Sequence, residues 1–199
     1  MTCLRKKGSL SGLIMPTLIV RSEQRFWERG QAVARMLQPI TKRRGGPAWE
    51  PKSIGTSTVV IATHDGGPPV SEYRGWRFAT VASGFNAMYH ERWSRKDKNV
   101  WELERAYLNI YKRTGLDELE FLCLHCDPLE TDTAPHARYK QGPHLHVSIA
   151  GEPIKHSHLA IHGGLLNVVL KSVATLSNTM EWAVQMIRDE VLDTITDQN

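Results

Sequence analysis

The sequence is poor in cysteine and has no long hydrophobic run. Three cysteines in 199 residues are an odd number for a disulfide framework, so we expect thiols or ligands in a reducing, cytoplasmic compartment. No apolar stretch reaches the roughly 18–20 residues that cross a bilayer, which predicts no membrane span. Residues 5–7 are basic and precede an apolar segment, but Pro16 and Thr17 interrupt that segment, so we expect no secretory signal.

Internal repeats and low-complexity tracts are also absent from the sequence. The 41% hydrophobic and 23% charged fractions are typical of a globular protein. The net charge is +4, and basic residues gather at 5–7, 42–44 and 92–98. Such clusters either bind the phosphates of nucleic acid or form solvated surface.

The N-terminal part predicts an amphipathic helix followed by a linker. Apolar residues recur at helical spacing from Ser22, which is placed to cap the helix, as far as Pro39. Residues 42–55 are basic and rich in glycine and proline, which predicts a surface linker. We therefore expect residues 1–50 to form a helical arm and basic linker that docks a protein partner, and residues 51–199 to form a second unit.

The second unit is expected to be α+β. Residues 84–93 are interpreted as a helical turn and 94–99 as a charged loop, while residues 178–181 resemble a capping box before a C-terminal helix. Alternating or β-branched runs predict strands at 57–63, 76–82, 100–113, 118–126, 144–149 and 159–162. The order favours a mainly antiparallel sheet packed against the C-terminal helix, with the N-terminal helical arm in addition.

The histidines are concentrated in one segment. Seven of the nine histidines and two of the three cysteines lie between Cys123 and His162. On a strand, the period of two places the side chains of His144 and His146 on one face. Such a pair suits either two ligands of a metal, most simply zinc, or acid–base catalysis. His156 and His158 repeat the spacing, so a hairpin would bring four imidazoles together; solvated histidines beside a loop are the alternative.

Residues near this cluster have several possible roles. On a strand, Cys123 and His125 face one way and Cys126 the other, so we expect Cys123 in the core and keep Cys126 as a candidate nucleophile. Asp127 is a turn residue, a ligand or a group that orients an imidazole. Arg138 and Lys140 either neutralise a phosphate or are exposed, in a loop over residues 130–141 that is expected to cover the site.

One resemblance covers roughly the C-terminal half of the chain. The apolar run with its acidic turn at residues 121–127, the element at 142–146 and the helix at 180–195 resemble the TumE-type proteins of toxin–antitoxin pairs. The chain departs from that pattern by its longer N-terminus, by Cys126 in place of an aromatic residue, and by the second histidine pair. The resemblance implies a toxin or phage-defence role with nucleic acid as the target.

Three hypotheses follow. The first is a hydrolase that acts on a phosphodiester of nucleic acid or a nucleotide, with His144 and His146 as metal ligands or as acid and base. His156 and His158 would complete its site, and Asp127, Arg138 and Lys140 would assist. The second is a non-catalytic accessory subunit with a structural metal or a partner-binding surface, and the third is a thiol enzyme that uses Cys126.

Overall fold

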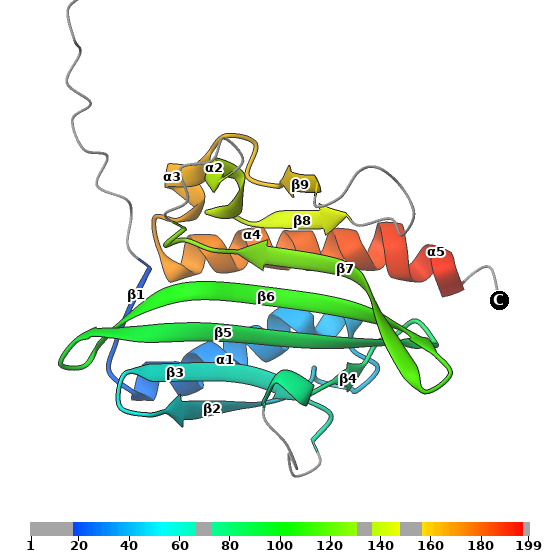
Figure 1. Ribbon diagram of the computed structural model, residues 1–199, viewed down its shortest axis with the longest axis horizontal. Coiled ribbons are helices and arrows are strands. Elements are labelled where there is room, and N and C mark those ends of the chain that lie inside the picture. Colours follow the sequence, from blue (N-terminus) through cyan, green and yellow to red (C-terminus); the bar gives the residue numbers. More distant parts are fainter. Residues whose placement is uncertain (1–17, 67–72, 131–136, 148–156, 197–199) are drawn as a thin grey trace, which may run out of the picture.

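The computed structural model describes residues 18–66, 73–130, 137–147 and 157–196. A nine-stranded sheet dominates it, with the order β2-β3-β5-β6-β7-β8-β9; β1 pairs with β6, and β4 pairs with β5 (Figure 1). Every pair is antiparallel. The strands are β1 Ile19–Arg21, β2 Ala48–Ile54, β3 Thr58–His64, β4 Phe78–Ala79, β5 Phe85–Asp97, β6 Val100–Thr114, β7 Asp117–Cys126, β8 His144–Val147 and β9 Ser157–Ala160.

Two long helices, α1 Gln24–Leu37 and α4 Val173–Ile187, pack on one face of this sheet and contact each other (Figure 1). They bury one large hydrophobic core with the strands. The α+β class, with a mainly antiparallel sheet and a helix from each end of the chain, is therefore confirmed. The shorter elements are η1 Gln38–Ile40, η2 Tyr73–Gly75, α2 Ala137–Lys140, α3 Leu166–Val169, the π-helical η3 Arg188–Leu192 and α5 Asp193–Thr196.

The alternation of residues along the strands gives the sheet two different faces. Leu108 on β6, and Leu124 and Cys126 on β7, belong to the core under the helices. Tyr107 and His125, each one position away, therefore lie on the opposite face. That second face carries the histidines and a small apolar cluster of Val60, Ala62, Tyr73 and Trp76.

Two predicted segments have a different structure. Residues 84–99 were expected as a helical turn and a loop, but β5 covers most of them, because Phe85, Ala87, Tyr89 and Trp93 are buried at strand spacing under the helices. The linker expected over residues 42–55 becomes β2 from Ala48 onward, paired with β3 along its whole length. This strand crosses the boundary expected near residue 50, and α1 packs into the core of the sheet instead of standing apart.

The helix starts also differ from the predictions. Ser22 has a φ of 83° and does not cap α1, which begins after Glu23 without a side-chain cap. The capping box of α4 is formed by Ser172 and Thr175, earlier than residues 178–181, which lie inside the helix. The buried side chains of α4 extend as far as Ile187, after which the π turn η3 brings Leu192 into the core.

Candidate metal centre

Strands β7, β8 and β9 bring four histidines to the sheet face opposite the long helices. His125 on β7 lies directly across from His144 on β8, and His146 lies across from His158 on β9. Directly opposed residues of paired strands share a face. The predictions that His144 and His146 share a face, and that a hairpin brings His158 against them, are confirmed. His156 lies outside the described residues.

Three of these side chains converge. The candidate ligand atoms of His125, His144 and His146 all lie within 4.8 Å of one another. The Nε2 atoms of His144 and His146 are 3.1 Å apart. Two nitrogens bound tetrahedrally to one metal at about 2.0–2.1 Å would be separated by about 3.3 Å. The three imidazoles are therefore close enough to hold a metal ion.

The backbone orients the imidazole of His144. Its Nδ1 lies 2.9 Å from the carbonyl oxygen of Gly142. Because a carbonyl only accepts, Nδ1 carries the hydrogen and donates it, and the lone pair of Nε2 points toward His146, from whose Nε2 it accepts a hydrogen bond when no metal is bound. A ring nitrogen anchored in this way to a carbonyl is the usual arrangement of a metal-binding histidine.

An aromatic neighbour orients the imidazole of His125. The rings of His125 and Tyr107 are stacked, with centroids 3.9 Å apart and planes 16° apart. The hydroxyl of Tyr107 donates a hydrogen bond to the carboxylate of Asp127. The buried Nε2 of His125 has no hydrogen-bond partner. An unsatisfied buried nitrogen costs about 1–3 kcal/mol, which is a poor arrangement for a purely structural histidine.

Burial keeps these imidazoles neutral. It lowers the pKa of His125 to about 3, with the neighbouring His146 and His144 adding to the effect. It also lowers the pKa of His144 to about 4. Neutral imidazole is the form that binds a metal, so both side chains are ready ligands near pH 7.

The other predicted site residues are placed less directly. Asp127 follows β7, and burial raises the pKa of its carboxyl. It is linked to the imidazoles through Tyr107, whose hydroxyl donates a hydrogen bond to Asp127 and whose ring stacks on His125. Lys140 forms an ion pair with Glu130 at 3.7 Å. The side chain of Arg138 and residues 131–136 of the expected covering loop lie outside the described residues.

The two cysteines lie on opposite faces of β7, as the alternation predicted. Cys123 is buried on the histidine face and accepts a hydrogen bond from the amide of Asn109, which fits the expected core role. Cys126 is buried under the helices, where its thiol donates to the carbonyl of Gln141. Burial raises the pKa of the Cys126 thiol well above its usual range. Since the thiolate is the nucleophile, this position gives no support to a thiol enzyme.

Sequence reasoning missed His125 as a ligand, and it did not single out His90. His90, Tyr107, His125 and His144 are successive partners across β5, β6, β7 and β8, so they form one row on the sheet face. His90 is buried, and its pKa is lowered to about 4 by burial and by Arg105. The sequence did place His125 on the same face of its strand as Cys123. Whether His125 lies next to His144 depends on how β7 pairs with β8, which the sequence does not show.

No protein-family model, curated protein or solved structure matches this chain. The chemistry of the site has to be inferred from its own residues. Within the described ranges, none of the helices is both long enough and apolar enough to cross a membrane.

Proposed function

We propose that this protein is a cytoplasmic, zinc-dependent phosphodiesterase acting on nucleic acid, with the metal bound by His125, His144 and His146. The convergence of three imidazoles within 4.8 Å carries the proposal, together with the burial that keeps His125 and His144 neutral. Three histidine ligands are the set that catalytic zinc sites use, with the fourth position left to water or substrate. A zinc ion in such a site polarises a phosphoryl oxygen and lowers the pKa of its bound water.

Basic residues beside the histidine row support a phosphodiester substrate. Lys52, Arg92 and Arg105 belong to one row across β2, β5 and β6, because Val60 on β3 pairs with both Lys52 and Arg92, and Arg92 pairs with Arg105. This row is displaced from the histidine row by two residues along each strand, which is about 7 Å. A nucleic-acid backbone that passes over the imidazoles would therefore meet Lys52, Arg105 and also Arg92, which is paired with Glu104 at 2.5 Å.

A shallow hollow continues the basic row. It has a volume of about 440 Å³, and its lining includes Lys52, Arg74 and Arg92. Nearer the imidazoles, the guanidinium of Arg105 lies 5.7 Å from the ring centre of Tyr107. These contacts would be to phosphate rather than to bases, so we propose affinity that falls with salt and depends little on nucleotide sequence.

The neighbouring residues have distinct proposed roles. His158 lies opposite His146, with ring centroids 4.3 Å apart, and would move a proton at the reacting phosphate. Tyr107 and Asp127 would hold the ring of His125 in its ligand orientation. The cations Arg105 and Lys140 would stabilise the negative charge that develops on the phosphate. The resemblance to TumE-type proteins supports a toxin or phage-defence role for this activity.

A second candidate function is a non-catalytic accessory subunit whose metal is structural. The observation that favours it is the position of two of the ligands, His144 and His146, on the short strand β8 near the end of the sheet, where an ion that also binds His125 would fix the pairing of β7 with β8. A structural site of this kind adds folding energy, whereas a catalytic site keeps an open position.

Elemental mass spectrometry on protein purified without a histidine tag tests the metal. We expect near-stoichiometric zinc in the wild type and none in the His144→Ala, His146→Ala double variant. His64→Ala is the matched control, because His64 lies on β3, where it accepts a hydrogen bond from Gly66 and packs against the ring of Trp76, and it is not among the three candidate ligands. Zinc missing from the wild type, even after incubation with zinc salt, would overturn the metal site.

Hydrolysis of labelled single-stranded RNA and DNA then separates the two functions. The catalytic proposal expects cleavage by the zinc-loaded wild type, and it expects His158→Gln to keep its zinc and its thermal stability but lose most of the cleavage. The structural alternative expects no cleavage and a large loss of thermal stability when zinc is removed.

A further inference from the structure

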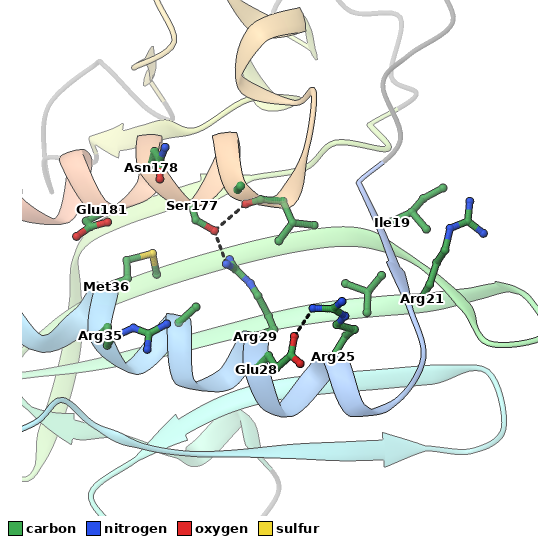
Figure 2. A pocket seen from close by; sticks show the side chains of 14 residues that line it. Ile19, Arg21, Arg25, Glu28, Arg29, Arg35, Met36, Ser177, Asn178 and Glu181 are labelled. Carbon is green, nitrogen blue, oxygen red and sulfur yellow. Dashed lines mark hydrogen bonds and ion pairs between the residues drawn. The ribbon is translucent and has the colours of Figure 1, made fainter.

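A second cavity lies on the helix side of the sheet, away from the histidines. It has a volume of about 740 Å³ and is bounded by β1, α1 and α4 (Figure 2). Ligand sites typically have volumes of about 300–1,000 Å³ and combine apolar walls with a few polar groups. The apolar part of its lining consists of Ile19, Val20, Ala32, Met36, Val173 and Ala174.

The charged lining of this cavity is mainly basic. Four arginines line it, together with the acidic residues Glu28 and Glu181; the arginines are Arg21, Arg25, Arg29 and Arg35. Arg25 is paired with Glu28 at 2.6 Å, and Arg29 is neutralised by the buried Glu91. Arg21 and Arg35 form no ion pair with any residue that the structure describes. The cavity therefore has cationic groups to offer to a ligand.

One end of the cavity is the more favourable for an anion. Arg21 and Arg25 lie at this end, on β1 and on the first turn of α1. The first turn of α4 also lines the cavity, through Val173 and Ala174. The N-terminus of a helix of 15 residues carries a partial positive charge that attracts anions. Figure 2 shows the guanidinium of Arg29 reaching from α1 to Ser177 on α4, where it donates a hydrogen bond between the two walls.

We propose that this cavity binds a small organic anion, with its carboxylate or phosphate at the end formed by Arg21, Arg25 and the first turn of α4. The apolar part of the ligand lies against Ala32, Met36 and Val173. Arg25 releases part of its pairing with the exposed Glu28 to contact the anion. A residue spacing of ten between Arg25 and Arg35 on α1 corresponds to about 15 Å, so a ligand with a medium-length chain fits along the helix. The proposal is independent of the metal site on the other face.

Isothermal titration calorimetry with octyl phosphate, octanoate, inorganic phosphate and uncharged octyl glucoside tests this proposal. We expect octyl phosphate or octanoate to bind the wild type at one site, and octyl glucoside not to bind. The Arg21→Gln, Arg25→Gln double variant should weaken binding about tenfold or more, because charge-assisted hydrogen bonds to the anion are lost. Arg188→Gln is the matched control, since Arg188 lies on η3 and pairs with Asp193.

A second variant tests the apolar part. The Ala32→Phe variant fills the cavity from α1, so it should abolish the binding of octyl phosphate and octanoate. Circular dichroism checks that the variant is folded. The proposal is overturned if neither octyl phosphate nor octanoate binds, if the double variant binds like the wild type, or if inorganic phosphate binds as tightly as octyl phosphate. Binding of an acidic peptide such as hexaglutamate, without binding of octyl phosphate or octanoate, would overturn the proposal in favour of a protein partner.

Discussion

The two faces of the sheet each carry a cluster of buried polar groups, and the two clusters are satisfied very differently. Under the helices, the carboxylate of Glu91 accepts hydrogen bonds from Arg29, Tyr89 and Trp93 at 2.5–3.1 Å. On the opposite face, the Nε2 of His125 is buried without a partner, and the Nε2 atoms of His144 and His146 face each other at 3.1 Å.

This difference separates a structural network from a ligand site. A buried charge is retained only when its partners are in place, and those of Glu91 come from α1 and from β5 itself. Groups that converge on one point and leave a buried nitrogen unsatisfied are suited to hold a metal ion or another ligand there. We therefore expect substitutions in the first cluster to affect folding and substitutions in the second to affect metal binding.

The largest effect is expected for Glu91→Ala. Removing this carboxylate leaves the guanidinium of Arg29 buried and unpaired, which should lower the free energy of unfolding by about 3–5 kcal/mol in urea denaturation. Glu28→Gln is the control, because the Arg25–Glu28 pair is exposed and should contribute about 0–1 kcal/mol. Equal effects of the two substitutions would mean that the buried network is not structural.

The second effect concerns the ligands themselves. His125→Ala or His144→Ala should lower the affinity for zinc by more than about 100-fold, since loss of a ligand exceeds the 10- to 100-fold effect of losing a group that orients one. Competition with a fluorescent zinc chelator measures this change. The metal-free variants should keep their free energy of unfolding, in contrast to Glu91→Ala. Unchanged zinc affinity in either variant would remove that histidine from the site.

A third effect is expected when the pH falls. The pKa of His125 is lowered to about 3 and that of His144 to about 4, both by burial, so these imidazoles bind protons more readily in the unfolded chain, where the pKa is about 6.5. These two histidines should therefore add no pH dependence to the free energy of unfolding of the metal-free protein above pH 7. They should lower that free energy as the pH falls from about 6.5 toward 4. Each histidine contributes up to about 1.4 kcal/mol per pH unit.

Urea denaturation in the presence of a chelator at pH 7.5, 6 and 5 checks this dependence. The His125→Gln, His144→Gln double variant should lose less stability than the wild type between pH 6.5 and 5. An identical slope in both proteins would show that other groups cause the acid sensitivity.

Local alternation was enough to predict part of the fold and two of the three candidate ligands. The hairpin of β6 and β7, the strand β8 and the shared face of His144 and His146 all follow from the period of two. The prediction failed in β5, because charged residues such as Glu91 and Arg92 break the apolar pattern. Glu91 is compensated by Arg29, 62 residues away, and nothing in a local window reveals that partner.

The third candidate ligand, His125, was missed for a similar reason, because its partner also comes from a distant part of the chain. His125 joins the candidate ligands because β7 pairs with β8 in a register that sets His125 against His144 and Cys123 against His146. A shift of one residue would turn the histidines of one strand to the other face. The chain between the two strands is too long for a turn type to set that register, so it could not be predicted from spacing.

The smallest effect is expected for the pair that orients His125. Tyr107→Phe keeps the ring that stacks on His125 but removes the hydroxyl that donates to Asp127, so the affinity for zinc should fall by about tenfold. Tyr111→Phe on the same strand is the control, because its ring contacts Arg77 and not a histidine. Zinc competition titrations measure both variants. If Tyr107→Phe binds zinc like the wild type while Tyr107→Ala does not, the stacked ring alone orients His125. In that case Asp127 has no part in orienting the site, and the hydrogen bond from Tyr107 to Asp127 contributes nothing to zinc binding.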